Sequence, residues 1–364
     1  MVVSLALRLA ARRPHVLTIA PAPVTDDLLA VRLAAEAELA RRRWPAADSP
    51  ADADVVLVAG GLGRRMTAVV RAVWATVPAP RVLVTVGAAA ELAEALDRAQ
   101  ERLARGGDPD VSDAAPLTPS VSDAAPLTLD VRNSTSSIGE SPAPEPVMAG
   151  LADSDRDGLA LDALHVVLGP VLPDWPAGLV VHAALAGDLV TDARAEVLDV
   201  PGPRDRPGGR HGPLGPDRTR LDALVRVLGL AGADRAAARA RTLRDGDPAP
   251  GETAAFGQRL ARSRTLAWTL RGIALAATDH VPVPESTVEA RVRALAAGLG
   301  GSLAPPVRPA AHRAVAALVG LELGAARLAL AAMDPDTALG AGPVEPFRPA
   351  TAGHDHHHGH EHHG

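Results

Sequence analysis

The sequence predicts an α/β domain followed by a second domain of the α+β class. In residues 1–105, short apolar segments alternate with longer helical segments, and this order builds a parallel sheet with helices on both faces. The segment 54–59 is almost entirely apolar, which is typical of a strand covered on both faces. Further along, Gly187-Asp188 separates two apolar runs, as the turn of a β-hairpin does.

The first domain is predicted to contain strands at 15–20, 54–59 and 82–86 and helices at about 26–43, 64–75 and 89–103. The helix at 26–43 has two aspartates at its start and three arginines at its end, as the helix dipole favours. Strands and helices in this alternation predict a flavodoxin-like parallel sheet.

The second domain is predicted to open with strands at 164–168, 179–186 and 189–197. Helices follow at about 217–229, 233–244, 252–274, 285–298 and 310–333. Between the domains, the segment 111–118 recurs as 121–128, a tandem repeat rich in Pro, Ser and Asp. Such a repeat has no apolar face to bury, so it predicts a disordered linker. The expected divisions are 1–105, 106–155 (linker), 156–340 and 341–364 (tail).

Composition restricts the classes of function. A length of 364 residues favours two domains, and 47% hydrophobic residues is ample for a core. The net charge of −6, with no basic tract, argues against nucleic acid as a partner. The sequence contains no run of eighteen apolar residues, so it predicts no membrane span. At the N-terminus, the basic residues follow an apolar stretch, which is the reverse of the order in a signal peptide. A cytoplasmic location is therefore expected.

A family resemblance lies in residues 49–89. This stretch contains Ser49-Pro50, an apolar strand that ends in Gly60, Arg64-Arg65-Met66, and a second strand followed by Gly87. It resembles the cluster-bearing small subunit of respiratory complex I and of the membrane-bound NiFe hydrogenases of the hydrogenase-4 type. The resemblance implies an oxidoreductase relative with a flavodoxin-like fold and a 4Fe-4S cluster held by cysteines.

The chain contains no cysteine, whereas a 4Fe-4S cluster needs thiolate ligands. One family cysteine falls on Ala89. The earlier pair falls on Ala22 and Thr25 or, with a one-residue shift, on Pro23 and Asp26. We therefore expect no cluster, and we treat Ala22, Thr25 and Ala89 as vestigial cluster positions.

A weaker resemblance lies in the second domain. The stretch from Gly169-Pro170 to Gly178, followed by the Gly187-Asp188 turn, is similar to the start of the large subunit of the same complexes. The segment 262–272 and the closing 333–336 are similar to further parts of that subunit. The nickel-binding cysteine motif and the quinone-binding histidine loop are both missing. The resemblance thus implies a fusion of small and degenerate large subunits that lacks the motifs for hydrogen and quinone chemistry.

Two further features are candidate binding sites. The loop Gly60-Gly61-Leu62-Gly63 follows a strand and opens a helix, where backbone amides can hold a phosphate. The third glycine of the dinucleotide pattern is replaced by Met66, which favours a structural turn or a contact made by Arg64 and Arg65. In the tail, neutral imidazoles can bind Ni or Zn. The candidate metal ligands are His354, His356, His357, His358, His360, His362 and His363.

The leading expectation is a cluster-free, non-catalytic scaffold subunit of a membrane-bound complex I-like or hydrogenase-like assembly, peripheral on the inner face of the membrane. Its partners would be membrane-arm and other subunits. No paired carboxylates or Ser-His-Asp set stands out as catalytic machinery. The alternative is a Ni or Zn metallochaperone or metal store that acts through the His-rich tail.

Overall fold

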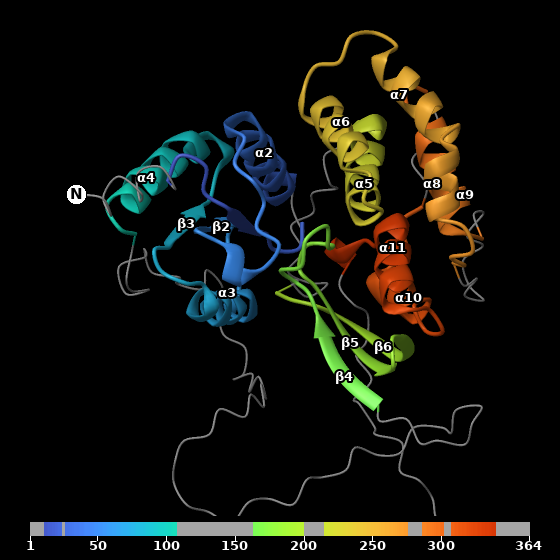
Figure 1. Cartoon of the computed structure of the whole chain (residues 1–364), viewed down its shortest axis with the longest axis horizontal. Helices are drawn as coiled ribbons and strands as arrows, with labels where there is room; N and C mark the ends of the chain where they lie inside the picture. Colours follow the sequence, from blue (N-terminus) through green and yellow to red (C-terminus); the bar gives the residue numbers. More distant parts are fainter. Residues whose placement is uncertain are drawn as a thin grey trace, which may run out of the picture.

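The computed structural model describes residues 11–23, 26–107, 163–199, 215–275, 286–301 and 307–339. The predicted linker beyond residue 107 and the His-rich tail lie outside these residues. We call residues 11–107 the N-terminal unit and residues 163–339 the C-terminal unit. Each contains one three-stranded sheet, parallel in the first and antiparallel in the second, so the mixed α/β class is confirmed (Figure 1).

The parallel sheet consists of β1 (Val16–Ile19), β2 (Val55–Ala59) and β3 (Val82–Val86), in that order across the sheet. All five residues of β2 are buried, as an apolar central strand requires. Beyond β1, Ala46 forms an isolated parallel bridge with Val16. The chain therefore runs from β1 to one side of the sheet at Ala46 and then to the other side through β2 and β3.

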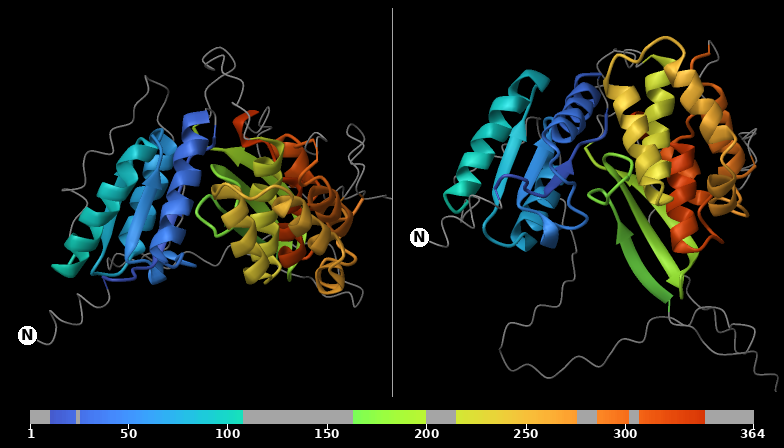
Figure 2. Two further views of the ribbon diagram at one scale, coloured as in Figure 1. Left: turned by 90° about the horizontal axis from the view of Figure 1, so that it is seen from above. Right: turned by 45° about the horizontal axis from the view of Figure 1, so that its top comes forward.

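Helices cover both faces of this sheet. The two helices α2 (Asp26–Arg42) and α4 (Leu92–Ala104) share a core with one face, while α3 (Arg64–Thr76) packs on the other (Figure 2). Short 3-10 turns lie at Pro50–Asp52 and Ala89–Glu91. The predicted helix at 89–103 thus begins as a 3-10 turn and becomes α-helical only at Leu92.

The antiparallel sheet consists of β4 (Ala163–Leu168), β5 (Leu179–Ala186) and β6 (Leu189–Val197), with β5 in the centre. The predicted hairpin is confirmed, because Gly187-Asp188 joins β5 to β6. Gly187 has a φ of 64°, a left-handed conformation that glycine adopts without steric cost. The outer edge of β6 pairs with a segment near residue 321 from the end of the unit.

The helices of the C-terminal unit pack beside this sheet (Figure 1). They are α5 (Pro216–Leu230), α6 (Asp234–Asp245), α7 (Glu252–Ala261), α8 (Arg264–Thr269), α9 (Val288–Ala297), α10 (Ala311–Ala316) and α11 (Leu323–Met333). Two long predicted helices, 252–274 and 310–333, are each divided, so those predictions were wrong in extent. The first is interrupted at Ser263, whose side chain caps α8 by accepting a hydrogen bond from the Leu266 amide.

The second division is caused by the sheet. The Val190 amide donates to the Leu321 carbonyl at 2.9 Å, and the Gly320 amide donates to the Val190 carbonyl at 2.8 Å. Backbone groups that pair with β6 are not available for helical hydrogen bonds. The same pairing covers a sheet edge that would otherwise be open.

The two units share their cores. Ala22, which follows β1, belongs to the apolar cluster of the C-terminal unit. Conversely, Val180 of β5 and Leu198, which follows β6, belong to the cluster between α3 and the parallel sheet. The units are therefore joined by apolar packing as well as by polar contacts between their side chains.

A search of the described residues for membrane spans finds no helix with the length and apolarity to cross a bilayer.

Candidate functional site: the junction between the two units

The junction lies at the edge where the strands of the parallel sheet end. In open α/β sheets, ligands bind outside the carboxyl ends of the strands, where the strand order reverses direction. Here that point lies between β1 and β2, because the chain leaves β1 toward Ala46 and leaves β2 toward β3. The loops that follow β1 and β2 are therefore where this architecture would place a ligand.

Asp199 of the C-terminal unit occupies the start of α3. Its carboxylate accepts hydrogen bonds from the backbone amides of Arg65, at 3.1 Å, and Met66, at 2.7 Å. These amides belong to the first turn of α3, where donors have no partner within the helix. The N-cap residue, Gly63, has no side chain to satisfy them. Asp199 thus supplies the helix cap from 134 residues away.

The glycine at position 63 is explained by this contact. A Cβ there would lie 2.2 Å from the Asp199 Cγ, a distance that no carbon pair tolerates. Asp199 itself has a φ of 55°, an uncommon conformation for a residue with a side chain. The Gly60-Gly61-Leu62-Gly63 loop is therefore a structural turn in contact with the second unit. The position where it would hold a phosphate is filled by a carboxylate of the same chain.

The loop after β1 is closed in a similar way. Ala22 is buried, and a Cβ on Gly178 would lie 2.6 Å from the Ala22 amide nitrogen. Gly178 ends the loop between β4 and β5, and at the start of that loop a Cβ on Gly169 would lie 2.3 Å from the indole nitrogen of Trp175. That indole donates to the Leu179 carbonyl at 2.8 Å. The two glycines that carried the large-subunit resemblance are thus positions of close backbone packing.

The vestigial cluster positions are not brought together as a group. Ala22 is buried under the C-terminal unit, whereas Ala89 is exposed at the start of a 3-10 turn after β3. Since β2 lies between β1 and β3, the ends of those two strands are separated by about 10 Å, two strand spacings. Thr25 lies outside the described residues.

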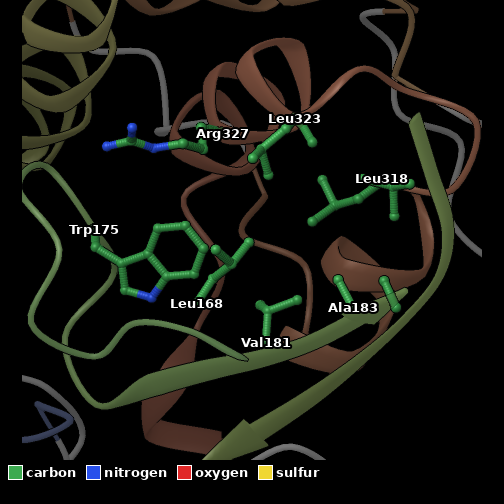
Figure 3. A pocket seen from close by; sticks show the side chains of 10 residues that line it. Leu168, Trp175, Val181, Ala183, Leu318, Leu323 and Arg327 are labelled. Carbon is green, nitrogen blue, oxygen red and sulfur yellow. The ribbon is translucent and has the colours of Figure 1, made fainter. Parts of the chain in front are cut away.

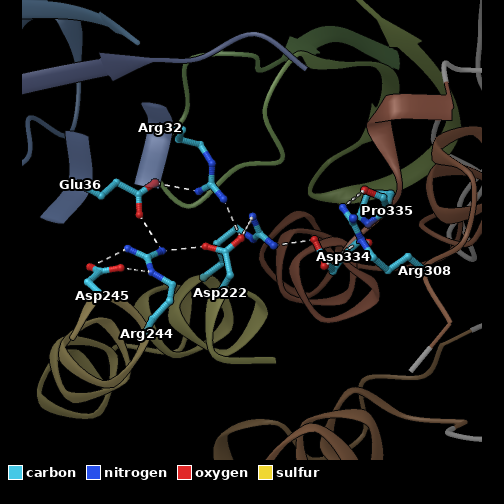
Figure 4. Close-up of polar contacts among 9 residues, drawn as sticks. Arg32, Glu36, Asp222, Arg244, Asp245, Arg308, Asp334 and Pro335 are labelled. Carbon is cyan, nitrogen blue, oxygen red and sulfur yellow. Dashed lines mark hydrogen bonds and ion pairs between the residues drawn. The ribbon is translucent and has the colours of Figure 1, made fainter. Parts of the chain in front are cut away.

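A cluster of ion pairs forms the second half of the junction (Figure 4). We call it the ion cluster; its members are Arg32, Glu36, Asp222, Arg226, Arg244, Asp245, Arg308 and Asp334. Four of these side chains are cationic and four are anionic, so their charges balance. Two come from α2 of the N-terminal unit and six from the C-terminal unit.

Asp222 lies at the centre of the ion cluster. Its two carboxylate oxygens lie 2.7 Å from Arg32 and 2.7 Å from Arg244, and Arg226 approaches to 3.2 Å. Arg244 also contacts Glu36 at 2.7 Å, and its side chain has no exposure to solvent. Glu36 in turn contacts Arg32 at 2.7 Å. A closed ring of contacts therefore joins α2 to α5 and α6.

The pKa values follow from burial and from these partners. Burial by itself would raise the pKa of Asp222, but Arg32, Arg226 and Arg244 outweigh it and hold that pKa far below its usual range. Burial also acts to raise the pKa of Glu36, but Arg32 and Arg244 outweigh this effect, so the pKa is lowered. Both carboxylates are therefore ionised at neutral pH, which the ring of contacts requires.

Asp174 behaves differently from these two carboxylates. It lies in the loop between β4 and β5, with Arg241 as its nearest cation at 3.9 Å. Burial raises its pKa, and the more distant arginines do not fully offset that effect. A Cβ on Gly229 would lie 2.3 Å from an Asp174 carboxylate oxygen, so this group is packed against α5.

A third polar contact links the sheets of the two units. Arg65, at the start of α3, pairs with Glu196 of β6. The other oxygen of Glu196 lies 2.9 Å from Nε2 of His182 on β5. Partial burial and the nearby charge of Arg65 lower the pKa of His182, so the neutral imidazole is favoured at neutral pH.

A cavity in the C-terminal unit lies between the antiparallel sheet and the last helices (Figure 3). It is lined mainly by apolar side chains, among them Leu168, Trp175, Val181, Leu318 and Leu323. Its volume is about 10 Å³, which admits one water molecule at most. This cavity does not hold a substrate or cofactor.

The predicted metal ligands of the tail lie outside the described residues. Within the described ranges, no group of three or more His, Asp or Glu side chains is arranged to hold a metal ion. The His-rich tail therefore remains the candidate metal site that its composition predicts.

Sequence reasoning did not identify Asp199, nor the ion cluster. The only local signal for the cluster lies in α5, where Arg220, Asp222 and Arg226 interrupt an otherwise apolar segment. That helix is buried on every side between residues 220 and 228. Charges in such a helix require partners, although the sequence does not say which ones.

Comparison with protein-family models, with curated proteins and with solved structures finds no match for this chain.

Proposed function

We propose that this protein is a cluster-free, non-catalytic scaffold subunit of a membrane-bound complex I-like or hydrogenase-like assembly. The proposal combines the resemblance of residues 49–89 with the absence of cysteine from the chain. It places the protein at the inner face of the membrane, in contact with membrane-arm subunits.

The observation that carries the non-catalytic part is the occupation of the sheet edge by the chain itself. Asp199 caps α3, and Gly178 packs against Ala22, so the loops after β1 and β2 face protein. An enzyme of this architecture would keep that edge accessible to its ligand. A scaffold benefits instead from two units held in a fixed orientation, which the ion cluster favours.

The finer fold assignment belongs to the same proposal. We infer a flavodoxin-like sheet in which Ala46 marks a minimal second strand. The order Ala46, β1, β2, β3 and the placement of α2 and α3 on opposite faces support it, since the crossovers from β1 to Ala46 and from β2 to β3 then have the same hand, as such sheets require.

The test is co-purification from native membranes. A tagged full-length chain, expressed at its natural level, should migrate with membrane-arm subunits after mild detergent extraction, as followed by native gel electrophoresis and mass spectrometry. Deleting the gene should lower the amount of the assembled complex. A chain that is recovered entirely as a free protein, with the complex intact in its absence, would refute the proposal.

Iron analysis tests the cluster-free part separately. The purified protein, incubated anaerobically with iron and sulfide, should bind no stoichiometric 4Fe-4S cluster, because no thiolate is present to ligate one. A 4Fe-4S signal in electron paramagnetic resonance at one cluster per chain would contradict it.

The second candidate function is delivery or storage of nickel or zinc by the His-rich tail. Seven histidines within residues 354–363 favour it. Binding should weaken as the pH falls through about 6.5, since imidazole binds metal only when neutral. Removing residues 354–364 should abolish most binding measured by calorimetry. Equal binding with and without the tail would eliminate this candidate.

A further inference from the structure

An exposed aromatic residue distinguishes the surface formed by α7 and α8. The side chain of Trp268 is 72% exposed, whereas the other tryptophans, Trp44, Trp74 and Trp175, are buried. An exposed tryptophan is unfavourable in water unless a partner covers it, and tryptophan is enriched where proteins bind one another.

Four exposed arginines accompany Trp268 in this part of the chain: Arg259, Arg262, Arg264 and Arg271. The sequence 253–275 contains no acidic residue. Among the described residues, no carboxylate forms an ion pair with any of these four guanidinium groups. We call these four arginines and Trp268 the basic α7–α8 surface.

Several exposed arginines elsewhere in the molecule are neutralised locally. On α4, Arg98 pairs with Glu94 at 2.5 Å and Arg105 pairs with Glu101 at 3.2 Å, both with i,i+4 spacing. In the part of the chain that the structure describes, the basic α7–α8 surface has no such partner, and its four guanidinium groups carry a charge of about +4, although the whole chain has a net charge of −6.

Part of this surface lies on α8. Arg264 and Trp268 are four residues apart within α8 and so lie on one side of that helix, while Arg271 follows two residues after the helix ends. Leu266 and Leu270 on the opposite side are buried in the core of the C-terminal unit. The Ser263 cap closes the start of α8. The exposed side of α8 is thus held in place by the packing of its opposite side against the core of the C-terminal unit.

We propose that the basic α7–α8 surface docks a carboxylate-rich surface of a partner protein, which deepens the proposed function and rests on it. Guanidinium groups bind carboxylates through paired hydrogen bonds, and tryptophan and arginine are the residue types enriched in interface hot spots. A membrane surface fits less well, because the neighbouring exposed residues Thr265, Thr269 and Gly272 offer no apolar area for insertion.

Poly-L-glutamate serves as the probe for a direct test with the full-length protein. Because the other tryptophans are buried, quenching by acrylamide reports mainly on Trp268. Adding the probe should shift the emission to shorter wavelength, protect Trp268 from acrylamide, and lose affinity as salt is raised. Neutral poly-glutamine should do none of these.

Paired charge-reversal variants locate the binding. The double variant Arg264→Glu/Arg271→Glu should bind labelled poly-L-glutamate at least about tenfold more weakly in fluorescence anisotropy. The matched control Arg71→Glu/Arg235→Glu makes the same charge change at exposed positions elsewhere and should bind as the wild type does. Circular dichroism should show all variants folded. Equal weakening in both pairs would overturn the proposal, as would stronger binding of phosphatidylglycerol vesicles or duplex DNA than of poly-L-glutamate.

The same variants separate this inference from the proposed function in cells. If the wild type and the control co-purify with the membrane complex and Arg264→Glu/Arg271→Glu does not, the surface is the docking site. If all three co-purify, the scaffold function stands and the docking inference fails. If the wild type does not co-purify, the scaffold function fails, while the binding measured on the purified protein still decides the properties of the surface.

Discussion

The two halves of the junction hold the units together by different physical means. At the sheet edge, one carboxylate, that of Asp199, meets backbone amides of α3 in a contact that resembles an ordinary helix cap. In the ion cluster, eight side chains depend on one another, and Asp222 alone contacts three arginines. The first contact can be removed with a local effect, whereas the second leaves buried charges without partners when any central member is lost.

The largest expected effect is that of Asp222→Ala. This change leaves Arg32, Arg226 and Arg244 near one another without their shared counter-charge, and breaking such a buried pair costs about 3–5 kcal/mol. Urea unfolding at pH 7 measures the loss. Asp97→Ala removes an exposed carboxylate that pairs with Arg42 and is the control, with an expected loss below about 1 kcal/mol. Similar losses for the two variants would mean that the ion cluster is not cooperative.

The contribution of the ion cluster to stability should also depend on pH. The pKa values of Glu36 and Asp222 are lower in the folded protein than in the unfolded chain, so the unfolded chain binds more protons at low pH. Their contribution to stability is fully present above about pH 5 and is lost progressively as the pH falls through and below the unfolded-state pKa values. The free energy of unfolding should therefore fall between about pH 5 and pH 3, and less steeply in Glu36→Gln. An equal slope in that variant would exclude Glu36 as a cause.

A smaller effect is expected at the sheet edge. Asp199→Ala removes the cap of α3 and should cost about 1 kcal/mol, whereas Asp199→Asn retains an acceptor and should cost less. Gly63→Ala should also destabilise, because its Cβ would collide with Asp199. In the double variant Gly63→Ala/Asp199→Gly no Asp199 side-chain atom is left to collide, so the loss should be less than the sum of the losses of Gly63→Ala and Asp199→Gly. Strict additivity in urea unfolding would argue against the contact.

The smallest expected effect belongs to His182→Ala. His182 is half exposed and its partner Glu196 retains Arg65, so the change should alter the free energy of unfolding by about a few tenths of a kcal/mol. Glu196→Ala removes both contacts and should cost more. A larger loss for His182→Ala than for Asp199→Ala in the same urea measurement would mean that the sheet-to-sheet contact stabilises the junction more than the helix cap does.

Much of the secondary structure could be predicted because its signals are local. The buried strand at Val55–Ala59 follows from an apolar run, and the hairpin of β5 and β6 follows from Gly187-Asp188 between two such runs. The helix starting at Asp26 was indicated by its terminal charges. In each case, the residues that determine the element lie within it or next to it.

The candidate site could not be predicted in this way. Arg65 and Asp199 are 134 residues apart, and Arg32 and Asp222 are 190 residues apart, so no local pattern pairs them. The glycine-rich loop after β2 suggested a phosphate, because its own amides are free until another part of the chain caps them. The sequence also could not show that Trp268 is exposed while the three other tryptophans are buried.

The sequence by itself determined the order of strands and helices, the glycine turns, and the absence of thiolate ligands for a cluster. Only the tertiary structure decided that pairing of Gly320 and Leu321 with β6 divides the predicted helix 310–333, that Asp199 fills the start of α3, and that the charges of α2, α5 and α6 neutralise one another. The physical reason is the difference in sequence separation over which the two kinds of interaction act. Backbone preferences and apolar periodicity act over a few residues, whereas burial and ion pairing depend on which distant segments the fold brings into contact.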